Sequence, residues 1–79
     1  RFGLGYALRA LSRDRATVAL SLVGGGAAPG AALVGTIDTV GADHLDLAEH
    51  PEGVPRRREN VTAHTTVPFW ALVLVESRR

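Results

Sequence analysis

Arginines interleaved with aromatic residues near the N-terminus are the part of the chain best suited to bind a ligand. Arg9, Arg13 and Arg15 follow Phe2 and Tyr6. Guanidinium groups can neutralise the phosphates of a nucleic-acid backbone while neighbouring aromatic rings stack on its bases. This pattern favours contact with RNA or single-stranded nucleic acid. A solvated helix face, or a surface that holds a further N-terminal segment, explains the same residues.

A second group of polar side chains crowds a predicted hairpin, and it consists of Asp43, His44, Asp46, Glu49 and His50. Because side chains alternate along a strand, His44, Asp46 and His50 share one face, which is a permissive arrangement for a metal ion. The solvated outer face of a half-buried strand carries the same residue types, and we expect no metal here.

The chain shows no arrangement typical of catalysis. Ser12, Ser21 and Ser77 have no orienting partner in recognisable relation to a histidine, and no two carboxylates are placed as an acid and a base. The loop at residues 24–30 is rich in glycine, but a strand rather than a helix is expected after it, which is unlike a phosphate-binding loop. We therefore expect no enzymatic activity, no cofactor and no small-molecule substrate.

The composition is that of a small and nearly neutral protein. The chain has 79 residues, a formal net charge of +1 and no cysteine. We expect a single domain over residues 1–79 in the cytoplasm, without a membrane-spanning segment. Nucleic-acid binding would have to come from local clusters of arginine. The run Arg56–Arg58 lies in a predicted surface loop, where solubilising charge is the simpler explanation.

Apolar periodicity predicts one helix followed by five strands. Residues 4–13 form a helix because Leu4 and Leu8 fall on one apolar stripe. The strands are expected at residues 17–23, 32–40, 44–49, 61–67 and 70–76. We therefore predict a mainly β fold, with an N-terminal helix and a bent, five-stranded antiparallel small barrel over residues 17–76. Gly35 would allow the bend, because it has no side chain to crowd the strand crossing.

The last predicted strand is apolar on both faces. One face would carry Trp70, Leu72 and Leu74, and the other Ala71, Val73 and Val75. A chain of this size cannot bury both faces by itself, so one face or the strand edge would meet another copy. We expect a homo-oligomer whose interface comprises Val61, Ala63, Val67, Trp70, Val73 and Val75.

This order of elements resembles the Sm-like superfamily of LSm and Hfq-type proteins, which includes the bacterial RNA chaperone Hfq. The matching residues are Val18-x-Leu20-x-Leu22, Leu33-x-Gly35-x-Ile37 at the centre of the first Sm motif, and Leu45-x-Leu47. The chain is most similar to the short Sm-like domains of high-GC Gram-positive bacteria. The resemblance implies a small barrel that assembles into rings and binds RNA.

The chain departs from the Sm pattern at the positions that contact RNA. Asp43 or His44 stands near the place of an asparagine in many Sm proteins, so the resemblance implies an RNA contact there. Val67-Pro68-Phe69-Trp70-Ala71 replaces the lysine-histidine pair of Hfq and the arginine-glycine of other Sm proteins. We predict non-catalytic binding of RNA or single-stranded nucleic acid by an oligomeric ring. The alternative is a protein-interaction or structural barrel that binds no RNA.

Overall fold

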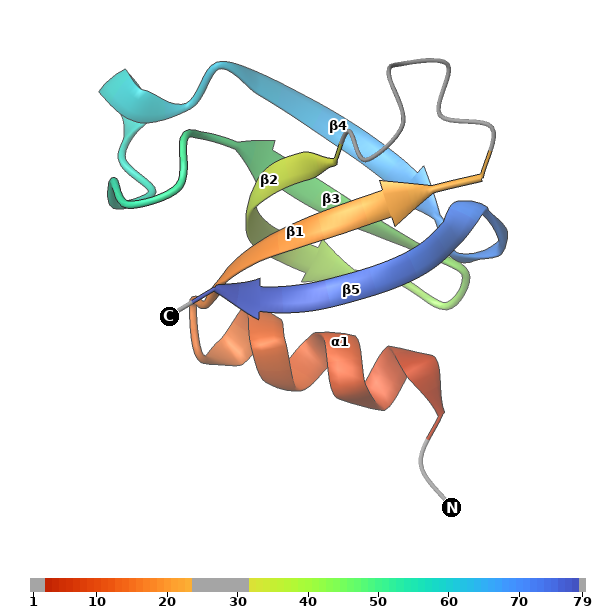
Figure 1. The fold of residues 1–79 in the computed structure, drawn as a ribbon. Coiled ribbons are helices and arrows are strands. Elements are labelled where there is room, and N and C mark those ends of the chain that lie inside the picture. Colours follow the sequence, from red (N-terminus) through yellow and green to blue (C-terminus); the bar gives the residue numbers. More distant parts are fainter. Residues whose placement is uncertain (1–2, 24–31, 79) are drawn as a thin grey trace.

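The computed structural model of the chain describes residues 3–23 and 32–78. Helix α1 (Leu4–Arg13) precedes the strands β1 (Thr17–Leu22), β2 (Leu33–Val40), β3 (His44–Glu49), β4 (Ala63–Pro68) and β5 (Leu72–Arg78). Two 3₁₀ helices, η1 (Arg58–Asn60) and η2 (Phe69–Ala71), precede β4 and β5 (Figure 1). The predicted mainly β fold with an N-terminal helix is confirmed. The predicted loop at residues 24–30 lies outside the described residues.

Helix α1 packs against the sheet through one apolar stripe. Leu8 is 1% exposed and belongs to the core, and Leu11 packs against it. The Ser12 hydroxyl donates a hydrogen bond of 2.9 Å to the Ile37 carbonyl oxygen of β2. Because this bond and the apolar stripe both face the sheet, the arginines of α1 are left on the solvent side.

The sheet has the strand order β4-β3-β2-β1-β5, and all neighbouring strands are antiparallel. Its register shifts between Ile37 and Thr39, and again at Ser21 and Leu22, and such irregularities bend a sheet. A Cβ atom on Gly35 would overlap the backbone carbonyl of Ala48. The strands therefore pass so closely at Gly35 that no side chain fits there.

The sheet curves but does not close into a barrel. Within the described residues, β4 pairs with β3 alone and β5 pairs with β1 alone. After β4, the chain turns through η2, and Val23 N donates to Ala71 O over 2.7 Å, which directs the chain to β1 rather than back along β4. The fold is thus a bent open sheet in which β4 and β5 each have a free edge (Figure 1).

The predicted alternation of the last strand is wrong at its start. Trp70 lies in η2 instead of the strand and is 79% exposed, whereas Ala71 is buried. The ladder pairs Leu74 with Ser21 but Leu72 with Leu22, so Val73 is an extra residue that has no partner in β1. Val73 and Leu74 are both exposed for this reason, although they are neighbours in sequence.

Among the described residues, seven apolar side chains that are larger than alanine and at most 1% exposed pack together as the core: Leu8, Val18, Leu20, Ile37, Leu45, Leu47 and Val67. Val67 was predicted to lie at an oligomer interface. Its side chain is enclosed by the core of its own chain, so any contact with a neighbouring copy would run through its backbone on the edge strand β4.

Candidate nucleic-acid interface

Three segments that are distant in sequence meet at one end of the sheet. Phe69 N donates to Asp43 O over 2.8 Å and joins η2 to the turn between β2 and β3. Gly41 N donates to His44 O over 2.7 Å and closes that turn. Arg9 of α1 reaches the same turn, with 3.5 Å between its Nη2 atom and Gly41 O. We call Arg9, Gly41, Asp43, His44 and η2 the turn face.

Close backbone approach explains how the turn face is assembled. A Cβ atom on Gly41 would lie 2.5 Å from Cε1 of His44, so the imidazole lies directly against the Gly41 backbone. A Cβ atom on Gly5 would lie 3.8 Å from Cε2 of Phe69 and 3.3 Å from Nη1 of Arg9. Helix α1 therefore approaches η2 at Gly5, and the Arg9 side chain lies over that contact.

The polar groups of the turn face are open to solvent. His44 Nδ1 lies 2.9 Å from Asp43 Oδ1, and the Asp43 side chain is 91% exposed. Carboxylate oxygens accept up to four hydrogen bonds, so Asp43 keeps acceptor capacity for a base N–H or a ribose hydroxyl. Arg9 forms no ion pair in the described part of the chain. Its charge is available to a phosphate.

Of the other predicted contact residues, Arg13, Arg15 and Tyr6 are not part of the turn face. Arg13 is exposed one helical turn beyond Arg9, and Arg15 follows at the C-terminal end of α1. Tyr6 is 53% exposed on the same helix, and Phe2 lies outside the described residues. The structure therefore brings together Arg9, Asp43 and His44, and it separates them from Arg15.

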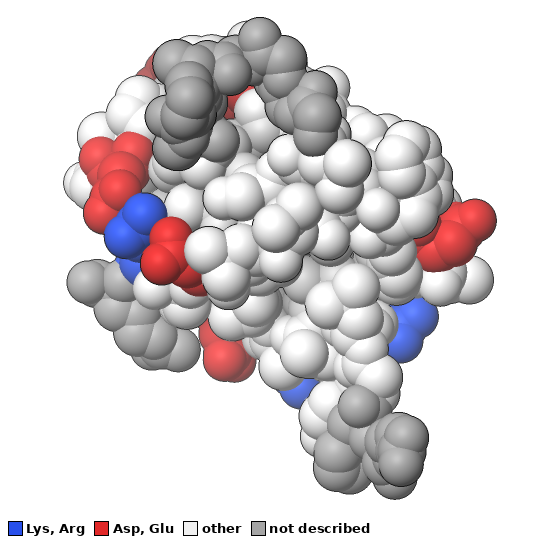
Figure 2. Space-filling view, turned by 45° about the vertical axis from the view of Figure 1, so that its right-hand side comes forward, with Lys and Arg blue, Asp and Glu red and all other residues white. Residues whose placement is uncertain are grey.

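Exposed apolar side chains lie in η2 and in the β5 strand that follows it. Trp70 is 79%, Val73 66% and Leu74 50% exposed. Figure 2 looks onto the side that carries η2 and β5 and shows a broad surface without charged residues, with Asp, Glu and Arg only at its margins. Among the other predicted interface residues, Ala63 is exposed, whereas Val61 and Val75 are half-buried. This uncharged surface is the largest feature of that side of the molecule.

Asp46 does not combine with His44 and His50 into a metal site. The carboxylate of Asp46 accepts hydrogen bonds from Thr39 over 2.6 Å and from Thr66 over 2.8 Å, which lower its pKa below the ordinary value. His50 is 3% exposed, and its ring nitrogens contact Thr36 and the Pro51 carbonyl. The described residues contain no group of three potential metal-ligating side chains. His64 is exposed on β4.

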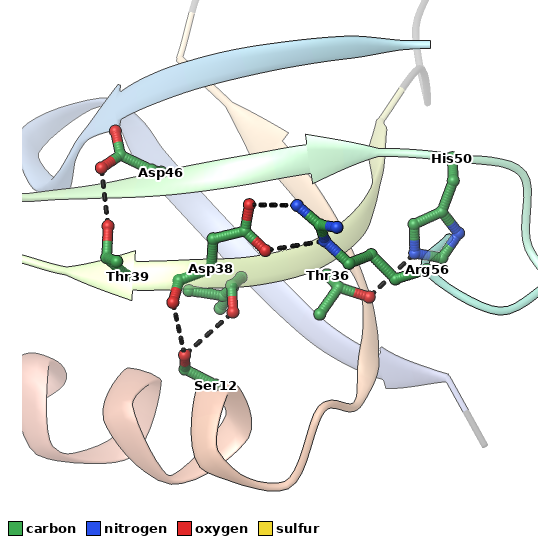
Figure 3. A network of polar contacts seen from close by, with 8 residues as sticks. Ser12, Thr36, Asp38, Thr39, Asp46, His50 and Arg56 are labelled. Atoms are coloured by element: carbon green, nitrogen blue, oxygen red, sulfur yellow. Dashed lines mark hydrogen bonds and ion pairs between the residues drawn. The ribbon is translucent and has the colours of Figure 1, made fainter. Parts of the chain in front are cut away.

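Arg56 makes a contact that the sequence did not indicate. Its Nε and Nη2 atoms donate to the two carboxylate oxygens of Asp38 over 2.9 and 2.8 Å (Figure 3). The hydrogen bonds and then the charge of Asp38 raise the pKa of Arg56. Eighteen residues separate the partners, so no local pattern could have shown the pair. Arg56 therefore fastens its loop to β2 and is more than solubilising charge.

No helix in the described part of the chain is long and apolar enough to cross a membrane. Comparison of the chain with known protein families, curated proteins and solved structures finds no match.

Proposed function

We propose that the chain is an Sm-like module that binds single-stranded RNA without catalysis and works as a cytoplasmic homo-oligomer. The observation that carries the proposal is the turn face, where Arg9 and the Asp43–His44 turn meet η2 with its exposed Trp70. These groups come from three separate elements, yet direct contacts hold them at one end of the sheet.

Each group of the turn face has a distinct role in this proposal. Arg9 contacts a backbone phosphate, because its guanidinium is exposed and unpaired with any described carboxylate. Asp43 accepts a hydrogen bond from a base or a ribose hydroxyl. Trp70 stacks on a base, an interaction that contributes about 1–3 kcal/mol and tolerates every base. Binding is therefore expected to depend on salt and only weakly on sequence.

In a homo-oligomer, each copy of the chain would contribute one turn face. The free edges of β4 and β5 and the exposed Val73 and Leu74 are surfaces through which copies can associate. Several turn faces on one oligomer would bind a single strand with avidity, since each further contact becomes intramolecular. A formal net charge of only +1 is compatible with this mode of RNA binding, because no single copy of the chain has to bind RNA tightly.

Fluorescence anisotropy with a labelled uridine-rich oligonucleotide tests the proposal. We expect binding at low salt that weakens as salt rises, because phosphate contacts release counterions. Arg9→Glu should weaken binding by about tenfold or more. Arg57→Glu is the matched control, since Arg57 is an exposed arginine of the loop before η1 and lies outside the turn face. An absence of binding at low salt, or an equal loss in both variants, would refute the proposed site.

A second candidate is a protein-interaction module that binds no RNA. The uncharged surface around Val73 and Leu74 favours it, because such surfaces are typical of protein contacts. An assembled wild-type protein without affinity for the oligonucleotide at low salt would support this candidate.

A further inference from the structure

A pocket of about 370 Å³ lies between the loop before β4 and the first residues of that strand. Its lining residues are Arg56, Arg58, Val61, Thr62, Ala63 and His64. The pocket is distinct from the turn face, because it lies at the start of β4 whereas η2 follows its end. Six residues of extended chain, roughly 20 Å, separate the two places.

The titratable groups in the lining are all basic. Two arginines and one histidine contribute to the wall, and no aspartate or glutamate does. The carboxylates of Asp38 and Glu49 have partners of their own: Asp38 pairs with Arg56, and Glu49 accepts a hydrogen bond from Thr65. Glu59 is exposed in η1, beside Arg58. Because Asp38 neutralises Arg56, the positive charge that the pocket offers to a ligand comes from Arg58, and the ring of His64 adds a polar group.

The guanidinium of Arg56 is held in place before any ligand arrives. Its Nε and Nη2 atoms bind Asp38, and both side chains are only about one quarter exposed, at 28% and 25%. Nη1, the third nitrogen of the guanidinium, takes no part in these two bonds and has no hydrogen-bond partner among the described residues. An immobilised donor loses little conformational entropy on binding, which favours affinity.

The rest of the wall is also tied to the fold. Asn60 N and Val61 N both donate to Arg57 O, over 2.8 and 3.1 Å, and shape η1 around Arg58. Thr62 N donates to Glu49 O over 2.8 Å, which fastens the end of the loop to β3. His64 then follows on β4, opposite Ala48 of β3. The basic side chains consequently project from anchored backbone.

We propose that this pocket binds a phosphate group, either as free phosphate or as the phosphate of a nucleotide. Guanidinium groups match the oxygens of a phosphate with two parallel hydrogen bonds, and His64 adds a ring N–H donor. The volume is in the range of small-ligand sites and leaves space for more than the phosphate itself. The inference does not depend on RNA binding at the turn face.

Titrations followed by two-dimensional amide NMR test the proposal, with inorganic phosphate, uridine monophosphate and uridine as three separate probes at low ionic strength. Phosphate should give saturable shifts centred on Thr62, Ala63 and His64. Uridine monophosphate should produce the same shifts, and uridine should produce none. Tighter binding of the nucleotide than of phosphate would identify the nucleotide as the ligand class, whereas equal affinity would identify the phosphate alone.

Single substitutions test whether phosphate binds in the pocket or is attracted by positive charge in general. Arg58→Gln and His64→Gln should each weaken phosphate binding by about fivefold or more, whereas Arg57→Gln, the adjacent exposed arginine outside the lining, should change it by less than about twofold. Arg9→Glu should leave the phosphate shifts intact, which keeps this test independent of the turn face. Val61 and Ala63 were also expected to contact another copy, so the titrations are run at a concentration where light scattering gives a constant mass.

Three results would overturn the proposal. The first is an equal loss of affinity in Arg57→Gln and Arg58→Gln. The second is a response to uridine that matches the response to its monophosphate. The third is an absence of saturable shifts at residues 62–64 in a protein that remains folded.

Discussion

A Cβ atom added to Gly35 or to Gly41 would collide with a neighbouring group. At Gly35 the obstacle is the Ala48 carbonyl of the neighbouring strand, and at Gly41 it is the His44 ring. The role of Gly35 could be predicted because a glycine interrupted an alternating apolar run. The role of Gly41 could not, because it depends on where the His44 side chain lies.

Gly35→Ala is expected to destabilise the protein by about 2 kcal/mol or more, since the added methyl group meets backbone that cannot move aside cheaply. Thermal unfolding followed by circular dichroism measures the change. Gly5→Ala is the control: its nearest neighbour is the flexible end of Arg9, and alanine favours a helix over glycine by up to about 1 kcal/mol. An unchanged melting temperature of Gly35→Ala would contradict the close strand crossing.

The stability of the folded protein depends on pH through Asp46. Hydrogen bonds from Thr39 and Thr66 lower the pKa of Asp46 in the folded state. The ionised carboxylate therefore stabilises the folded protein at pH values above the unfolded pKa of Asp46, and this stabilisation is lost as the pH falls through the folded pKa. Thr66→Val should raise the Asp46 pKa toward its ordinary value, as measured by carboxyl NMR titration. Thr65→Val, which removes a hydroxyl bonded to Glu49 instead, should leave the Asp46 pKa unchanged.

At the scale of elements, local periodicity predicted α1 with the bounds that the structure shows, and it placed all five strands within two residues at each end. It failed at η2, because Phe69, Trp70 and Ala71 are all apolar and contain no turn-forming residue. The turn there depends on contacts with distant residues: Phe69 N binds Asp43 O, and Ala71 O binds Val23 N. Such non-local contacts also create the turn face, of which sequence reasoning found Arg9, Asp43 and His44 separately.

The C-terminal end of α1 carries strain at Arg15, which has a φ of 56°. Arg15 N and Ala16 N donate to Ser12 O and Leu11 O in the manner of a helix-ending motif that usually contains glycine. Arg15→Gly should therefore stabilise the protein by about 1 kcal/mol in thermal unfolding. Arg13→Gly, at the last residue of the helix, should give no such gain, because glycine has a lower helix propensity than arginine. A loss of stability in Arg15→Gly would contradict this conformation.

At the scale of the whole molecule, the open sheet has two edge strands, β4 and β5, whose outer backbone groups are not paired with a further described strand. The molecule also carries an uncharged surface around η2 and β5 (Figure 2). We predict that Val73→Glu reduces the mass measured by light scattering at micromolar concentration, because a charge in an apolar contact is costly to desolvate. Ser77→Glu is the control, as it adds the same charge to the polar end of β5. A monomeric wild-type protein at tens of micromolar would contradict the assembly.

Trp70 is the only tryptophan of the chain, so its emission reports directly on the turn face. The decisive measurement is Trp70 fluorescence during titration with an unlabelled oligouridylate at low salt and constant protein concentration. Base stacking predicts saturable quenching that salt reverses and that Arg9→Glu removes, whereas Arg57→Glu retains it. Emission that does not respond to the oligonucleotide, or that changes only when the protein is diluted, would contradict RNA binding at the turn face and would assign Trp70 to contact between copies.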